Sequence, residues 1–155
     1  MSIGFGLIGA SSIARDVMIA AIRSHPNCEV KSVFSTNIER GKQYALENNI
    51  PNAKGSLEDL LNDDDIHAVY ISTTNELHHQ QVLSSAKAGK HILCEKPLAM
   101  SLDDAQEMIS VCKDENVVLA TNHQLRVGDG IRKMRDLVPE GAIGKPLAAR
   151  VFHAV

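Results

Sequence analysis

The sequence predicts an α/β fold with a doubly wound, mostly parallel sheet. Two observations carry this prediction. Short apolar runs alternate with amphipathic stretches along most of the chain, an order typical of a parallel sheet with helices on both faces. Glycines, hydroxyls and amides follow the apolar runs, at the carboxyl ends of strands where such sheets bind ligands. The 155 residues are enough for one core.

The individual elements follow from this alternation and from local end signals. Ser56 and Ser101 each precede an acid by three residues, a spacing that caps a helix start. Gly89 is placed to end a helix in the left-handed conformation. The predicted strands are residues 3–8, 30–34, 68–71, 91–94, 117–121 and 147–155. The predicted helices are residues 12–24, 38–48, 57–61, 76–88, 101–115 and 131–137.

Composition excludes several function classes. The net charge of -3 and the absence of tryptophan argue against nucleic acid as a partner. The apolar runs are only a few residues long, and the N-terminus lacks the features of a signal peptide, so we expect no membrane association. The three cysteines form no C-x-x-C pair, which predicts buried, reduced thiols in the cytoplasm. Adjacent His78 and His79 would point apart on a helix, so we expect no metal site.

The first strand leads into a candidate phosphate-binding turn. Gly4, Gly6 and Gly9 match G-x-G-x-x-G, but this frame lies inside the strand instead of after it. The frame that we favour is Gly9-Ala10-Ser11-Ser12-Ile13-Ala14. In it Gly9 makes the tight turn, Ser11 replaces the second glycine and Ala14 allows close helix packing, so that the helix N-terminus faces a pyrophosphate. The alternative is a plain turn with a serine cap.

The second strand bears on which dinucleotide binds. NAD enzymes place an acid here to hold the ribose 2′-hydroxyl. The strand instead ends in Ser35, Thr36 and Asn37, with Arg40 close behind, groups that suit a 2′-phosphate. Glu39 is the competing feature, and we place it on the following helix, facing away. The prediction is NADP(H), and the alternative is an ordinary helix start with a surface arginine.

Polar residues also follow two further strands. After residue 71 come Ser72, Thr73, Thr74 and Asn75, whose small side chains can line a ribose and a nicotinamide. The alternative, compatible with this role, is helix capping by Thr74 or Asn75. Asn122 and Arg126 are candidates for contact with a polyol or carbonyl ligand, unless they only form a loop network.

The segment Ile92-Leu93-Cys94-Glu95-Lys96-Pro97 carries the candidate catalytic group. A residue before proline is held in an extended conformation, so Lys96 is presented at a strand end. Its ammonium there can polarise a substrate carbonyl that receives a hydride and can donate a proton. Glu95 either orients this lysine or is an acid that faces a helix.

These motifs together resemble the Gfo/Idh/MocA family of oxidoreductases. The segments that carry the resemblance are residues 9–14, 72–78, 95–98, 122–126 and 141–146, with Glu95-Lys96-Pro97 the most specific. The resemblance implies a Rossmann-type domain, NADP(H), and a cis peptide before Pro97. It implies that the cofactor contacts Ala10, Ser11, Ser12, Ile13, Ser35, Thr36, Arg40, Ser72, Thr73, Thr74, Asn75, Glu76, Leu77, Glu95, Lys96 and Asn122.

The resemblance also implies a division of labour along the chain. Residues 1–122 would form the NAD(P)-binding domain, and residues 123–155 a last helix and the start of a substrate and dimerisation domain. The rest of that domain, with a catalytic Asp and His, is expected to be missing, so we expect little turnover from this chain alone. Lys96 and Arg126 are the candidate substrate contacts.

Within the family the resemblance is to enzymes that reduce a sugar ketone with NADPH. Two alternatives remain: an inositol-type or other polyol dehydrogenase, and a non-catalytic module that senses NADP(H). A homo-oligomer is expected for the full-length protein. A purely structural role would leave Glu95-Lys96-Pro97 without a reason.

Overall fold

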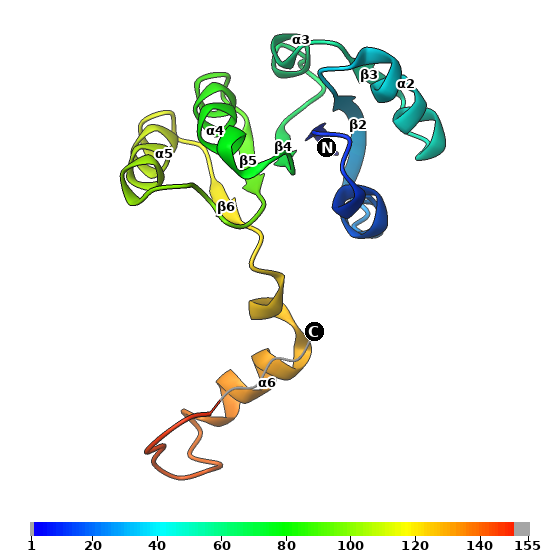
Figure 1. The fold of residues 1–155 in the computed structure, drawn as a ribbon. Coiled ribbons are helices and arrows are strands. Elements are labelled where there is room, and N and C mark those ends of the chain that lie inside the picture. Colours follow the sequence, from blue (N-terminus) through cyan, green and yellow to red (C-terminus); the bar gives the residue numbers. More distant parts are fainter. Residues whose placement is uncertain (1, 151–155) are drawn as a thin grey trace. The chain divides into compact units, whose positions relative to one another are not determined.

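The protein is described by a computed structural model that covers residues 2–150. The chain divides into two compact units, Met1–Asn122 and His123–Val155 (Figure 1). The first unit contains the sheet and the helices that pack on it, and the second contains two helical segments.

Six parallel strands form the sheet of the first unit, in the order β3-β2-β1-β4-β5-β6. The strands are β1 (Ile3–Ile8), β2 (Cys28–Phe34), β3 (Asn52–Lys54), β4 (Ala68–Ile71), β5 (His91–Cys94) and β6 (Leu119–Thr121). The order runs outward in both directions from β1 and β4, so the chain reverses its direction of winding between these two strands. This confirms the predicted doubly wound Rossmann-type sheet and makes the carboxyl ends of β1 and β4 the expected ligand site.

The helices follow the predicted end signals. They are η1 (Ala14–Met18), α1 (Ile19–Ser24), α2 (Ile38–Glu47), α3 (Leu57–Leu61), η2 (Asn75–Leu77), α4 (His78–Lys87) and α5 (Leu102–Asp114). Ser56 accepts a hydrogen bond from the Asp59 N–H, and Ser101 accepts one from the Asp104 N–H. Gly89 has a φ of 72° just after α4. These caps confirm the predicted starts of α3 and α5 and the predicted end of α4.

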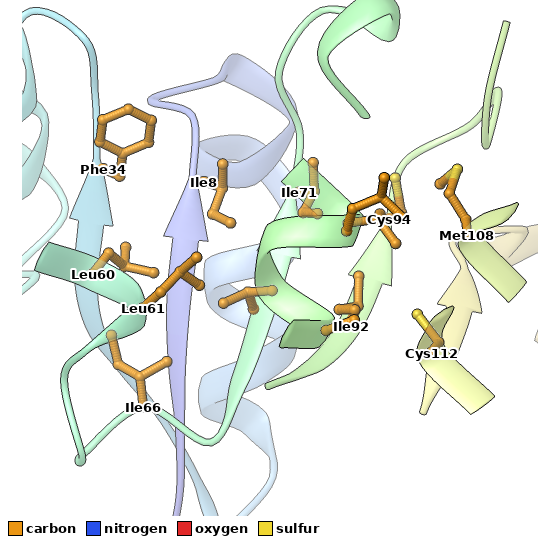
Figure 2. Packing of buried hydrophobic residues seen from close by; sticks show 14 residues of the cluster. Ile8, Phe34, Leu60, Leu61, Ile66, Ile71, Ile92, Cys94, Met108 and Cys112 are labelled. Atoms are coloured by element: carbon orange, nitrogen blue, oxygen red, sulfur yellow. The ribbon is translucent and has the colours of Figure 1, made fainter. Parts of the chain in front are cut away.

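Alternate residues of each central strand enter two separate cores. Leu7, Val33 and Tyr70 pack with residues of η1, α1 and α2 on one face. Ile8 and Phe34, the residues that follow Leu7 and Val33, pack on the other face with residues of α3, α4 and α5. Figure 2 shows this second core, in which Leu60, Leu61, Met108 and Cys112 approach the strand residues Ile8, Phe34, Ile71, Ile92 and Cys94. Side chains of a strand alternate in direction, so this arrangement buries both faces of the sheet.

The glycines of the first strand separate into two roles. A Cβ on Gly6 would lie 2.8 Å from Leu60 Cδ2, so Gly6 allows α3 to pack closely on the strand. Gly9 follows the strand with a φ of 107°, in the left-handed region that glycine tolerates. This confirms that the turn begins at Gly9 and that Gly4 and Gly6 belong to the strand.

The first unit differs from the sequence prediction in two elements. The strand β3 was not predicted, because it is only three residues long and reads Asn-Ala-Lys, without an apolar pattern. It forms because parallel pairing with Ser32, Val33 and Phe34 satisfies its backbone. The predicted helix 12–24 is helical throughout but contains the π-helical turn η1.

The second unit contains η3 (Gln124–Val127) and α6 (Asp129–Leu137). The helix predicted over residues 131–137 is therefore confirmed. The strand predicted over residues 147–155 is wrong for residues 147–150, which are irregular and are not part of the described six-stranded sheet. An alternating pattern does not form a strand by itself, because a strand needs a hydrogen-bonded neighbouring strand. The remaining residues of the predicted strand, 151–155, lie outside the described residues. No helix in residues 2–150 is long and apolar enough to cross a membrane.

Candidate functional site

A cavity of about 420 Å³ lies at the carboxyl ends of β1, β2 and β4. Its volume is in the range of small-molecule and cofactor sites. It forms at this edge because β1 has β2 on one side and β4 on the other, so the turns after all three strands meet. Its lining residues are Gly9, Ala10, Ser11, Ser12, Phe34, Ser35, Thr36, Arg40, Ser72, Thr73, Thr74, Leu77 and Gln81.

The turn after β1 is held in place by its neighbours. The Gly9 N–H donates to the Phe34 carbonyl oxygen at 3.0 Å, and the Ser11 and Ser72 hydroxyl oxygens are 2.7 Å apart. Ser11 Oγ also accepts from the Ala14 N–H at 3.1 Å. The serine-cap alternative therefore holds for Ser11, and it is compatible with phosphate binding because Ser11 and Ser12 also line the cavity.

Four consecutive backbone N–H groups of this turn have no acceptor among the described residues. Among residues 2–150, no hydrogen bond is donated by the N–H groups of Ala10, Ser11, Ser12 and Ile13. Free N–H groups at a helix start favour an anion, because they carry the positive end of the helix dipole. The turn is thus chemically suited to hold phosphate.

Arg40 reaches from α2 back to the same turn. Its Nη2 donates to the Ala10 carbonyl oxygen at 2.8 Å, and Arg40 lines the cavity together with Ser35 and Thr36. Asn37 caps α2 by accepting from the Arg40 N–H at 3.0 Å. Glu39 forms an exposed ion pair with Lys42 at 2.8 Å, which confirms that it points away from the cavity.

The turn after β4 supplies the hydroxyls of Ser72, Thr73 and Thr74 and the side-chain amide of Asn75. Thr73 Oγ1 donates to Gln81 Oε1 at 2.6 Å, and Thr74 Oγ1 donates to Glu76 Oε1 at 2.6 Å. The hydrogen bond from Thr74 lowers the pKa of Glu76. Thr74 occupies the position before η2 but makes no side-chain bond to the helix backbone, so helix capping does not explain this residue.

A buried carboxylate follows β5. Glu95 is 8% exposed and accepts hydrogen bonds from the Tyr70 hydroxyl at 2.7 Å, Asn122 Nδ2 at 2.6 Å and the Lys96 N–H at 3.2 Å. Burial alone would raise the pKa of Glu95, but these three donors and the Lys96 charge outweigh it, so its pKa lies below its usual value. Glu95 is therefore an anion that the sheet edge holds, not an acid that faces a helix.

Lys96 follows this carboxylate at the exposed end of the strand. The Lys96–Pro97 peptide bond is cis, as the family resemblance implied. The next carbonyl oxygen, that of Pro97, lies 2.9 Å from His78 Nδ1, and the Thr73 carbonyl oxygen lies 3.3 Å from His78 Nε2. The buried His78 thus ties the cis-proline loop to the turn after β4, while the side chain of Lys96 forms no ion pair or hydrogen bond with any described residue.

The structure brings together most, but not all, of the predicted site residues. Eleven of the predicted cofactor contacts line the cavity: Gly9, Ala10, Ser11, Ser12, Ser35, Thr36, Arg40, Ser72, Thr73, Thr74 and Leu77. The predicted contacts Ile13, Asn75, Glu76, Glu95, Lys96 and Asn122 are not among its lining residues. Glu95 and Asn122 are instead joined to each other, and Arg126, an exposed residue, belongs to the second unit.

Sequence reasoning missed three residues of this region. Gln81 and Phe34 line the cavity, and Tyr70 bonds to Glu95. Gln81 could have been found, because it lies one helical turn after Leu77 on the same face. Tyr70 also carried a signal, since a tyrosine in an apolar strand needs a partner for its hydroxyl. Within residues 2–150, no group of three His, Cys, Asp or Glu side chains could hold a metal ion.

Comparisons with known proteins find an oxidoreductase family and individual oxidoreductases. Residues 3–123 match the Gfo/Idh/MocA family, described as an oxidoreductase family with an NAD-binding Rossmann fold. The chain is 56% identical to a 1,5-anhydro-D-fructose reductase from Ensifer adhaerens, over 97% of this chain and 45% of that protein. It is 34% identical to a trans-1,2-dihydrobenzene-1,2-diol dehydrogenase from Xenopus tropicalis, over 93% of this chain and 44% of that protein.

A solved structure gives the same picture. A 3-ketoreductase from Actinomadura kijaniata, in complex with TDP-benzene and NADP, superimposes with a TM-score of 0.83 at 29% identity. The match covers 93% of this chain and 45% of that one. The chain therefore spans a little under half the length of these relatives.

Proposed function

Because the chain belongs to the Gfo/Idh/MocA family of oxidoreductases, we propose that it binds NADP(H) in the cavity beyond β1, β2 and β4. In this proposal residues 1–122 are the cofactor-binding part of a reductase that transfers hydride from NADPH to a sugar ketone. Residues 123–155 begin the region that binds substrate and joins subunits in the longer protein.

The observation that carries the cofactor proposal is the chemistry at the end of β2. The side chains there are the Ser35 and Thr36 hydroxyls and the Arg40 guanidinium, while the acid Glu39 is turned away in an ion pair with Lys42. A guanidinium has five N–H donors, so Arg40 can keep its bond to the Ala10 carbonyl and still offer donors to a 2′-phosphate. This group of hydrogen-bond donors suits the ribose 2′-phosphate of NADP(H) better than it suits the 2′-hydroxyl of NAD(H).

The remaining cofactor contacts follow from the geometry of the turns. The N–H groups of Ala10 to Ile13, which donate to no described residue, suit the pyrophosphate. The Ser72, Thr73 and Thr74 side chains suit the nicotinamide ribose. Ile13, Asn75, Glu76, Glu95, Lys96 and Asn122 remain proposed contacts, on the strength of the family resemblance.

Lys96 is the proposed catalytic group. The bound nicotinamide supplies the hydride. Lys96 stands on a strand end beside the Glu95 anion, with its side chain unpaired among the described residues. An ammonium in this position can polarise a ketone oxygen and can give it a proton. The Lys96 charge in turn helps to lower the pKa of the neighbouring Glu95 carboxylate.

The proposed substrate is 1,5-anhydro-D-fructose, with 1,5-anhydro-D-mannitol as the product. This choice is supported by the 56% identity to the Ensifer adhaerens reductase. The 34% identity to a diol dehydrogenase supports, as the second candidate, oxidation of a diol or polyol such as an inositol. We further propose a cytoplasmic, homo-oligomeric full-length enzyme in which Arg126 contacts the substrate.

The cofactor proposal is tested by titrating this chain with NADPH and with NADH and following nicotinamide fluorescence. We expect saturable binding with a clear preference for NADPH, and a preference for NADH would contradict the assignment of Arg40. Steady-state NADPH oxidation with 1,5-anhydro-D-fructose tests the division of labour. We expect turnover from the longer protein and little or none from residues 1–155, so full activity of this chain would contradict that division.

Substrate profiling of the longer protein separates the reductase from its alternatives. Preferential oxidation of inositols with NADP⁺ would favour the polyol dehydrogenase. Tight NADPH binding without activity in either direction would favour a module that senses NADP(H).

A further inference from the structure

Two side chains of α2, one helical turn apart, donate to successive carbonyl groups of the turn after β1. Arg40 Nη2 donates to the Ala10 carbonyl oxygen at 2.8 Å, and the Tyr44 hydroxyl donates to the Ser11 carbonyl oxygen at 2.9 Å. Residues four apart on a helix lie on the same face. The face of α2 that carries Arg40, the residue predicted to bind the 2′-phosphate, therefore also donates hydrogen bonds to the turn predicted to bind the pyrophosphate.

The bond from Tyr44 has a geometric consequence for the turn. In a trans peptide the C=O and the following N–H point in opposite directions. Tyr44 draws the Ser11 carbonyl toward the core, so the Ser12 N–H is directed away from Tyr44. Ser12 lines the cavity, and Tyr44, which is 7% exposed, does not. By the same reasoning, the bond from Arg40 to the Ala10 carbonyl oxygen directs the Ser11 N–H away from the Arg40 guanidinium.

We propose that Tyr44 is a positioning residue for the pyrophosphate: it holds the Ser11–Ser12 peptide so that the Ser12 N–H faces the dinucleotide. The proposal rests on the proposed function, because it names a residue that prepares the same cavity without touching the cofactor. Arg40 acts on both the 2′-phosphate and the turn, whereas Tyr44 acts on the turn alone.

Other features of Tyr44 agree with this role. Burial raises the pKa of the Tyr44 phenol, so it stays protonated and remains a donor at neutral pH. The Ser11 carbonyl oxygen accepts a second bond from the Arg15 N–H at 3.2 Å, which uses both of its lone pairs. The ring of Tyr44 packs in the same core as Ala14 and Met18 of η1. The hydroxyl is the only polar group of this side chain, and it bonds to the Ser11 carbonyl oxygen of the turn.

The test is Tyr44→Phe, which keeps the ring and removes the hydroxyl. We expect the Kd for NADPH and the Kd for NADH to rise together, by about three- to tenfold, as for the loss of one hydrogen bond. The ratio of the two constants should stay unchanged, because the 2′-phosphate is not involved. The matched control is Gln43→Ala, which removes the 2.7 Å hydrogen bond to Glu47 on the exposed face of α2 and should change neither constant.

A second measurement reports on the turn without any ligand. In ¹H–¹⁵N spectra of the free chain, Tyr44→Phe should shift or broaden the amide resonances of Ser11 and Ser12, and Gln43→Ala should leave them in place. Unchanged affinities in Tyr44→Phe, beside a wild-type chain that binds NADPH, would overturn this inference alone. A loss of NADPH affinity only would also overturn it, since it would place Tyr44 at the 2′-phosphate. A wild-type chain that binds neither dinucleotide would overturn both the proposed function and this inference.

Discussion

The hydroxyl of Tyr70, a fully buried residue, donates a 2.7 Å hydrogen bond to Glu95 Oε1. Tyr70 lies on β4 and Glu95 directly follows β5. Because Ile71 pairs with Cys94 on these neighbouring parallel strands, the bond joins the carboxyl ends of β4 and β5. Burial and the nearby Glu95 anion raise the pKa of Tyr70, which keeps it a donor. The end of β5, next to the proposed catalytic Lys96, is therefore held by a hydrogen bond from a buried residue of β4.

Removal of this hydroxyl should destabilise the protein. Tyr70→Phe leaves the buried Glu95 carboxylate with one donor fewer, and we expect the free energy of unfolding to fall by about 1–3 kcal/mol. Tyr44→Phe is the matched comparison, because its hydroxyl bonds to a neutral carbonyl, and its cost should be smaller. Urea unfolding followed by circular dichroism measures both. Equal costs would show that the charge of Glu95 adds nothing to the bond.

Stability should depend on pH through Glu95. Its pKa is lowered in the folded protein, so the unfolded chain takes up this proton at a higher pH than the folded chain does. The stabilisation is complete above the unfolded value of about 4.3 and is lost as the pH falls through the lower folded value. Glu95→Gln cannot titrate, so its deficit in unfolding free energy relative to the wild type should shrink below about pH 4.3. A deficit that stays constant between pH 7 and pH 3 would contradict the assignment.

Arg40 should decide between the two dinucleotides. Arg40→Leu removes the proposed ligand of the 2′-phosphate, and a charge-assisted contact of this kind is worth about 10- to 100-fold in affinity for NADPH. NADH affinity should fall far less, so the preference for NADPH should disappear. Lys42→Leu, which removes an exposed cation from the same helix, is the control for net charge. If both variants weaken NADPH binding equally, the effect is one of general charge and not of a specific contact.

Gly9 should not tolerate a side chain. Its φ of 107° is unfavourable for alanine, and a Cβ would lie 3.0 Å from Thr73 Cγ2 and 3.3 Å from the Ser72 carbonyl group. We expect Gly9→Ala to cost about 1–3 kcal/mol of unfolding free energy and to weaken NADPH binding. Gly130→Ala in α6 adds a Cβ with no atom of residues 2–150 within 4 Å and should be neutral or stabilising. Wild-type affinity in Gly9→Ala would show that this turn does not approach the cofactor.

The cysteines should differ sharply in reactivity. Burial raises the pKa of Cys94 to about 12 and also raises the pKa of Cys112, while Cys28 is only half-buried. Since the thiolate is the reactive form, a thiol reagent should modify Cys28 first in the native protein and all three cysteines in urea. Cys28→Ser should abolish the fast phase. Rapid native labelling of Cys94 would mean that β5 opens readily.

Features that depend on neighbours along the chain could be predicted from the sequence, and features that depend on distant residues could not. Helix ends and buried strands were predicted well, because Ser56, Ser101 and Gly89 act on backbone groups within a few residues. The strand β3 was missed because its three residues carry no apolar pattern and only β2 gives it a partner. The strand predicted over residues 147–155 is absent from its described part, residues 147–150, for the converse reason: its alternating apolar pattern is present, but the described sheet does not include it.

The candidate site shows the same division. The sequence by itself determined the kind of sheet, the turn at Gly9, the absence of an acid at the end of β2 and the exposed position of Lys96, since each depends on residue type and on neighbours along the chain. Only the tertiary structure decided that Arg40 and Tyr44 grip the Ala10 and Ser11 carbonyls and that Tyr70 and Asn122 hold Glu95. These bonds join residues at least 25 positions apart. They depend on strand order and register, which bring the side chains together and which no short stretch of sequence specifies.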